Sequence, residues 1–93
     1  MSERQRLLND REKALLLHCL REHASYLLNK VDRLYQGLVD IDTVNEMRNV
    51  IGDELMSKGF KPNSEPNRYG LELESLIDRL ADLYIRPEER NQR

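Results

Sequence analysis

Apolar residues at alternating three- and four-residue spacing, between Arg11 and Leu38, constrain the fold more than any other feature of the sequence. They are Leu17, Leu20, Ala24, Leu27, Val31, Leu34 and Leu38. This spacing places all of them on one face of an α-helix. We therefore predict one long helix over about residues 10–38, which at about 1.5 Å per residue would be roughly 40 Å long. Asn9 or Asp10 is the expected N-terminal cap, and a start at Ser2, with Gln5 three residues on, is the alternative that would lengthen the helix by two turns.

The rest of the chain predicts two shorter helices. The first covers about residues 43–58, where Thr43 and Glu46 have the spacing of a capping box. Its apolar stripe consists of Val44, Met47, Ile51 and Leu55. Gly59 is expected to end this helix in a left-handed conformation. The second covers about residues 69–86 and follows a loop whose two prolines exclude a regular helix.

These elements predict an all-α fold, an antiparallel three-helix bundle with a long first helix. A chain of 93 residues is large enough to bury one core, so we expect a single helical domain over residues 1–93. Phe60 is expected to close one end of that core, and Asn67 or a neighbouring residue to cap the last helix. Residues 87–93, which begin with a proline, are predicted to form a frayed tail.

Charge and composition argue against several classes of partner. The chain has 15 basic and 17 acidic residues, and the two signs are interleaved, which is unlike a nucleic-acid surface. No stretch of about 18 apolar residues could span a membrane, so we expect no membrane partner. The N-terminal residues also lack the apolar run of a signal peptide. We therefore expect a cytoplasmic protein.

The residues that most often carry chemistry do not form a catalytic pattern. His18 and His23 lie five positions apart, which separates them by about 140° around a helix and prevents them from binding one metal together. Cys19 is the only cysteine, so no internal disulfide is possible, and no Cys/His cluster has zinc-ligand spacing. A structural thiol is expected. We predict no catalytic residue, no metal ligand and no cofactor.

Two rows of acidic residues leave one enzymatic alternative open. The row on the last helix consists of Glu74, Asp78 and Asp82. Its possible counterpart on the helix before it consists of Glu46, Asp53 and Glu54. If the rows faced each other they could hold magnesium, as in a metal-dependent phosphohydrolase built from a helical bundle. The first row lies on the far side of its helix from the apolar residues Leu73, Ile77 and Leu80, however. We therefore expect it to face water.

A second set of residues on the long first helix predicts a partner surface. Leu15, Cys19 and Tyr26 lie roughly opposite the main apolar face, with Glu22 and His23 beside them. The two shorter helices have too few apolar positions to cover the whole circumference of the first. We expect this surface to bind another protein, a second copy of the chain, or both.

The function predicted from the sequence is therefore that of a small non-catalytic protein-interaction module. An adaptor, an immunity or antitoxin-like protein, or a regulator would fit this description. Self-association through the first helix would make it a homodimer. The phosphohydrolase is the alternative.

Overall fold

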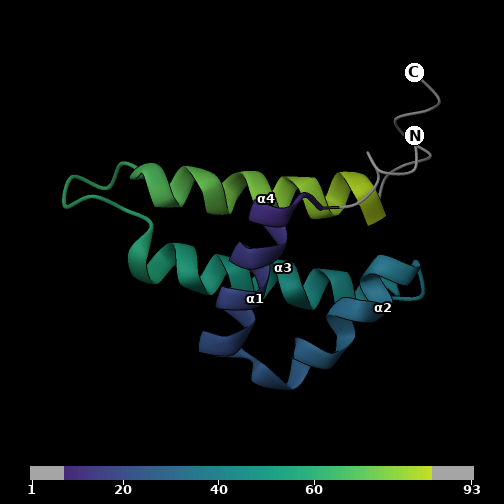
Figure 1. Ribbon diagram of the computed structural model, residues 1–93. Coiled ribbons are helices and arrows are strands. Elements are labelled where there is room, and N and C mark those ends of the chain that lie inside the picture. Colours follow the sequence, from purple (N-terminus) through teal and green to yellow (C-terminus); the bar gives the residue numbers. More distant parts are fainter. Residues whose placement is uncertain (1–7, 85–93) are drawn as a thin grey trace.

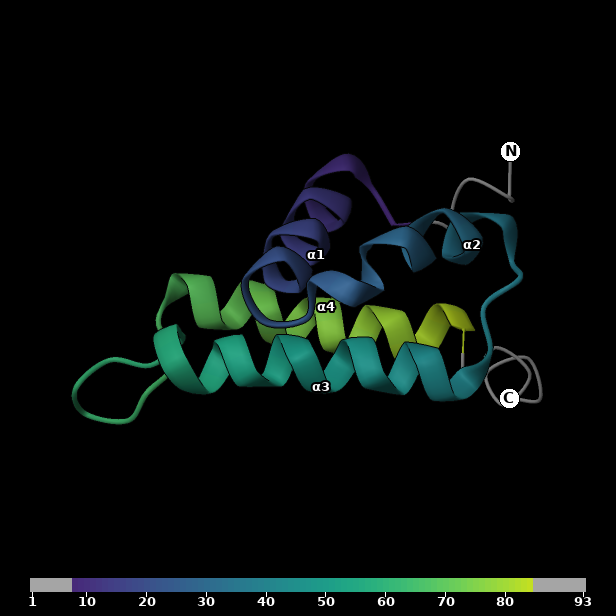
Figure 2. The same ribbon diagram turned by 90° about the horizontal axis from the view of Figure 1, so that it is seen from below.

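The two longest helices, α3 (Ile41–Lys58) and α4 (Arg68–Tyr84), lie side by side as an antiparallel hairpin and make the most extensive contact in the molecule (Figure 1). The computed structural model describes residues 8–84. On one face of the hairpin lie α1 (Asp10–His23), the 3₁₀-helix η2 (Ser25–Lys30) and the short α2 (Val31–Gln36), which together form a second layer (Figure 2). Helix α1 crosses the hairpin and packs mainly against α3.

The regular structure within residues 8–84 is entirely helical, apart from one isolated β-bridge between Phe60 and Pro66. The protein is thus an all-α globule of four α-helices, one of them short. No helix in this part of the chain is both long and apolar enough to cross a membrane. The predicted end of the last helix at Arg86 and the predicted tail over 87–93 lie outside the described residues.

The start of α1 confirms the predicted cap. The Asn9 side chain accepts a hydrogen bond from the Glu12 backbone N–H at 2.7 Å, and the Glu12 carboxylate accepts one from the Asn9 N–H at 2.9 Å. This reciprocal pair satisfies two of the N–H groups that a helix start leaves without partners. Asp10 and Glu12 also place negative charge at the positive end of the helix dipole.

The prediction of one continuous helix over 10–38 is wrong. The helix ends at His23, and Ala24 adopts φ −156° and ψ 63°, well outside helical values. Leu27 and Leu34 beyond the break are nevertheless buried, at 2% and 0% exposed. Neither glycine nor proline causes the break, so packing against the hairpin overrides local helix preference. A straight helix would carry Leu34 away from the core that it enters here.

The connection from α2 to α3 corrects a second prediction. Gly37 ends α2 with φ 75°, a left-handed conformation in which glycine avoids the strain of a side chain. Helix α3 begins at Ile41, because Asp40 caps it by accepting a hydrogen bond from the Thr43 N–H at 2.8 Å. That hydrogen bond holds the pKa of Asp40 below its usual value. The predicted capping box of Thr43 with Glu46 is therefore wrong.

The loop between α3 and α4 is set by a close approach of two glycines. A Cβ atom on Gly70 would lie 2.1 Å from the carbonyl oxygen of Gly59, so no side chain fits there. Gly59 itself has φ −93°, and the predicted left-handed cap at this residue is wrong. Asn67 caps α4 as predicted, accepting from the Gly70 N–H at 2.7 Å. Phe60 is 37% exposed and does not close the core as predicted.

The core is one cluster that joins both layers. Its largest buried apolar side chains are Leu16, Leu20, Leu27, Leu34, Met47, Ile51, Leu73, Leu76 and Leu80. The predicted apolar face of residues 17–38 contributes to it from both sides of the break at Ala24. Leu38, its last predicted member, is 70% exposed.

Candidate functional site

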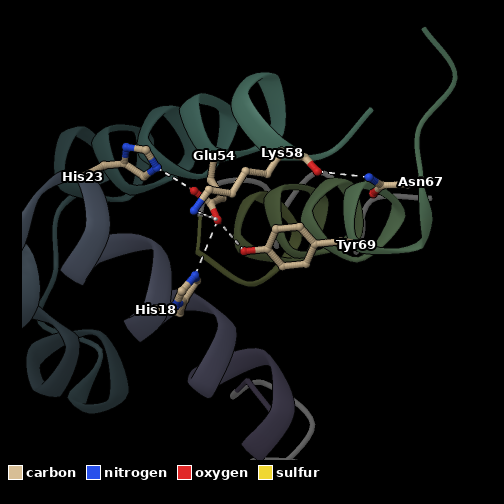
Figure 3. A network of polar contacts seen from close by, with 6 residues as sticks. All are labelled: His18, His23, Glu54, Lys58, Asn67 and Tyr69. Atoms are coloured by element: carbon tan, nitrogen blue, oxygen red, sulfur yellow. Dashed lines mark hydrogen bonds and ion pairs between the residues drawn. The ribbon is translucent and has the colours of Figure 1, made fainter. Parts of the chain in front are cut away.

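Glu54 is a charged residue placed among apolar side chains. It lies on α3 between the core residues Val50 and Ile51 and the exposed Lys58, and its side chain is fully buried. A buried carboxylate is stable only if hydrogen bonds and opposite charges replace the water it has lost. The structure supplies both from three helices (Figure 3).

Each carboxylate oxygen of Glu54 accepts one short hydrogen bond. His23, the last residue of α1, donates from Nε2 to Oε1 at 2.7 Å, and the Tyr69 hydroxyl on α4 donates to Oε2 at 2.6 Å. Two further basic side chains lie beside Oε2 of Glu54. His18 Nε2 is 3.5 Å from this oxygen, and Lys58 Nζ is 3.9 Å from it. We call these five residues the Glu54 cluster. It connects α1, α3 and α4 through a single side chain.

The electrostatics of the Glu54 cluster keep the carboxylate ionised. Burial raises the pKa of Glu54, but the hydrogen bonds from Tyr69 and His23 and the charge of Lys58 outweigh burial and leave the pKa below its usual value. The pKa of Tyr69 is raised, first by burial and then by its hydrogen bond to Glu54. Its hydroxyl therefore stays protonated and available as a donor.

Cys19 lies next to the Glu54 cluster and is fully buried. Burial and the negative charge of Glu54 raise the pKa of its thiol to about 12, although Lys58 acts in the opposite direction. At neutral pH the group is a thiol, which is a poor nucleophile. Because the Glu54 carboxylate is already occupied by donors, the arrangement fits an ionic clamp between helices better than an acid–base pair.

A groove lies between α1 and α4 near this cluster. It has a volume of about 520 Å³ and is lined by Asn9, Arg11, Glu12, Leu15, Arg68, Leu71, Glu72, Ser75 and Leu76. We call it the α1–α4 groove. An ion pair joins its two walls: Arg11 donates to Glu72, with Nε 2.8 Å from Oε2. A second hollow of about 560 Å³ shares Arg11, Leu15 and Glu72 with it.

The structure does not bring the predicted partner-binding residues together on one surface. Leu15 is half-buried in the α1–α4 groove, Cys19 belongs to the core, and His23 is held by Glu54. Glu22 is exposed on α1. Tyr26 is 65% exposed, but it follows the break at Ala24 and donates a hydrogen bond to Glu46 on α3. The partner-binding role of these residues stays a prediction.

The acidic rows are also placed differently from a metal site. Glu74 and Asp78 are exposed, as predicted, while Asp82 is half-buried and has a partner. Glu46 accepts from Tyr26, and Glu54 is occupied as described above. No group of three or more histidine, cysteine, aspartate or glutamate side chains within residues 8–84 could hold a metal ion.

Sequence reasoning missed the role of Glu54, although a signal was present. Val44, Met47 and Ile51 define a three-and-four spacing whose next positions are Glu54 and Lys58. A charged residue that continues an apolar stripe faces the core, where it needs a partner. The two histidines of α1 contact that residue, approaching its two oxygens separately.

Comparison with protein family models, with curated proteins and with solved structures finds no match for this chain.

Proposed function

We propose that this protein is a small non-catalytic interaction module that binds its partner in the α1–α4 groove. The observation that carries the proposal is the position of Leu71, which is 54% exposed on the groove wall. Half-buried Leu15 faces the same groove, and Leu76, at 1% exposed, lines it as part of the core. An apolar side chain from a partner would bury all of these surfaces.

Exposed apolar side chains occur singly on most proteins and by themselves indicate nothing. Leu71 differs because it lies beside a hollow that has an apolar lining and charged residues around it. Binding surfaces combine an apolar centre with a polar rim in this way. The groove also contains Leu15, the one predicted partner-binding residue that the structure places there.

The partner is another protein, a second copy of the chain, or both, and an adaptor, immunity, antitoxin-like or regulatory role would use such a groove. The cytoplasmic location expected from the sequence remains a prediction.

A photocrosslinking experiment tests the proposal. Benzoylphenylalanine in place of Leu71 should give a discrete light-dependent adduct in native cell extract, because the residue lies inside the binding surface. The matched control carries the same group in place of Leu38, which is 70% exposed after α2 and away from the groove. Mass spectrometry identifies the adduct, and light scattering of the pure protein reports self-association.

Two results would count against an interaction module. One is a strictly monomeric protein that gives no adduct from the Leu71 position. The other is an identical set of adducts from both positions, which would indicate non-specific contact. Leu15→Glu should abolish the Leu71 adduct, since it places an unpaired charge on the apolar lining.

A further inference from the structure

The α1–α4 groove is lined by two basic and two acidic residues, and one of the basic residues has no ion-pair partner among the described residues. Two of the four charged lining residues are acidic, and both are paired: Glu72 with Arg11, and Glu12 with Arg79 at 3.4 Å. The remaining lining charge is Arg68. Its exposed side chain forms no hydrogen bond or ion pair with any residue that the structure describes. The groove therefore presents an apolar lining and one arginine that forms no ion pair with a described residue.

The position of Arg68 in α4 also favours a negatively charged ligand. Arg68 is the first residue of α4, and the first turn of that helix contains no acidic residue. The start of a helix carries a partial positive charge from its aligned peptide dipoles. A carboxylate placed there would meet both the guanidinium and the dipole, and a carboxylate can accept two parallel hydrogen bonds from one arginine.

We propose that the occupant of the α1–α4 groove is an acidic peptide segment of another protein, which sets an apolar side chain against Leu15 and Leu71 and a carboxylate on Arg68. The inference rests on the proposed function and names the chemistry of its partner. Leu71 and Arg68 lie three residues apart on α4, on the same side of the helix. One short segment can therefore reach both.

A second copy of the chain fits this groove less well. In a symmetric dimer the same surface of each copy faces the other. Contact through the α1–α4 groove would then place both Arg68 side chains in one interface, where neither supplies the carboxylate that the other lacks. The two like charges would oppose association where they lie near the two-fold axis.

The test selects peptides from a displayed random library on the full-length protein and measures their affinities by fluorescence polarisation. Selected peptides should share an aspartate or glutamate at fixed spacing from an apolar residue. Arg68→Glu should weaken their binding by at least about tenfold, because it replaces an ion pair with repulsion. Arg21→Glu, a matched change at an exposed position of α1 outside the groove, should leave binding unchanged.

Exchanging the charges of Arg68 and the peptide carboxylate distinguishes a direct contact between them from an indirect effect on the structure. Changing the peptide carboxylate to lysine should restore binding to the Arg68→Glu variant and abolish binding to the unaltered protein. Both variants change exposed side chains, and thermal melting confirms that they remain folded. Restoration by the exchanged peptide would establish the contact with Arg68.

The possible failures are distinguishable. If Leu71→Glu blocks the selected peptides and Arg68→Glu does not, the groove binds a partner but the acidic chemistry is wrong. If neither change affects them, or if no peptide is selected, the groove proposal itself is overturned. If light scattering shows self-association that Leu71→Glu abolishes, the occupant is a second copy of the chain, and the inference of a separate acidic segment fails.

Discussion

His23 and Glu54 form the contact that ties the crossing helix to the hairpin, with Nε2 of the imidazole 2.7 Å from Oε1 of the carboxylate. The histidine stands at the end of α1, directly before the break at Ala24. Helix α1 therefore ends on the one buried charge of the described core. Tyr69 holds the other oxygen of the same carboxylate from α4.

Replacing Glu54 should show how much this contact contributes to the free energy of unfolding. Glu54→Gln keeps the shape but removes the charge, and its amide NH₂ would face a donor, either His23 or Tyr69. We expect the free energy of unfolding to fall by about 1–3 kcal/mol in urea melts. Asp53→Asn, on the exposed side of the same helix, should change it by less than about 0.5 kcal/mol. Equal effects of the two changes would contradict the clamp.

The difference in unfolding free energy between the unaltered protein and the Glu54→Gln variant should depend on pH in the acid range. The folded pKa of Glu54 lies below its ordinary value of 4.5, so its stabilisation is complete above that value and is lost as pH falls through the folded pKa. The same basic side chains, His18, His23 and Lys58, face this position in both proteins, so the comparison reports on the carboxylate. Urea melts from pH 6 to pH 3 should show the two stabilities converging. A constant difference would indicate that the charge contributes nothing.

The thiol of Cys19 should be unreactive in the folded protein. Its pKa is about 12 and it is fully buried, so the thiolate that attacks a disulfide reagent is scarce and shielded. With Ellman's reagent near pH 8, we expect the folded chain to react at least about 100-fold more slowly than the same chain in concentrated urea. Immediate labelling without denaturant would place Cys19 outside the core.

Two glycines in helices should respond oppositely to the same substitution. Gly70→Ala forces a methyl group onto the Gly59 carbonyl and should cost about 1–3 kcal/mol. Gly52→Ala, in the middle of α3 with open space around the position, should stabilise the protein by about 0.5–1 kcal/mol. Thermal melts measure both changes. Destabilisation by Gly52→Ala would mean that a neighbour lies closer than the structure shows.

Two leucines distinguish the broken helix from the continuous helix predicted by sequence. Leu27 lies in η2 and is 2% exposed, so Leu27→Ala should cost about 2–5 kcal/mol. Leu38 would occupy an equivalent buried position on a straight helix but is 70% exposed, and Leu38→Ala should change stability by less than about 0.5 kcal/mol. Comparable losses from the two substitutions would favour the straight helix.

The sequence predicts the helical class, the Asn9 and Asn67 caps and most of the core, because these features depend on local spacing and local hydrogen bonds. The spacing identifies Leu20, Leu27 and Leu34 as core residues even though the helix that should connect them is interrupted. The three-and-four spacing of apolar residues thus predicts which side chains are buried, but it does not indicate whether the helix that carries them is continuous.

The features that were not predicted depend on contacts between distant segments. Nothing local to Ala24 marks a helix end, and the break follows from the need of η2 and α2 to cover the hairpin. The Glu54 cluster joins residues 31 positions apart in the case of His23. The α1–α4 groove likewise requires Arg11 to meet Glu72, 61 positions away. Spacing within single helices carries none of this information.

The break at Ala24 also affects how the fold comes apart. It leaves the second layer as pieces of at most 14 residues, a length at which isolated helices are marginal in water, whereas the hairpin is built from helices of 18 and 17 residues. We therefore expect the second layer to open before the hairpin, so that its amide hydrogens exchange sooner than those of α3 and α4. Opening of the second layer would expose the Glu54 carboxylate to water. Its hydration would offset part of the free energy lost on separation, so we expect the layers to separate more easily at the Glu54 cluster than at an all-apolar interface.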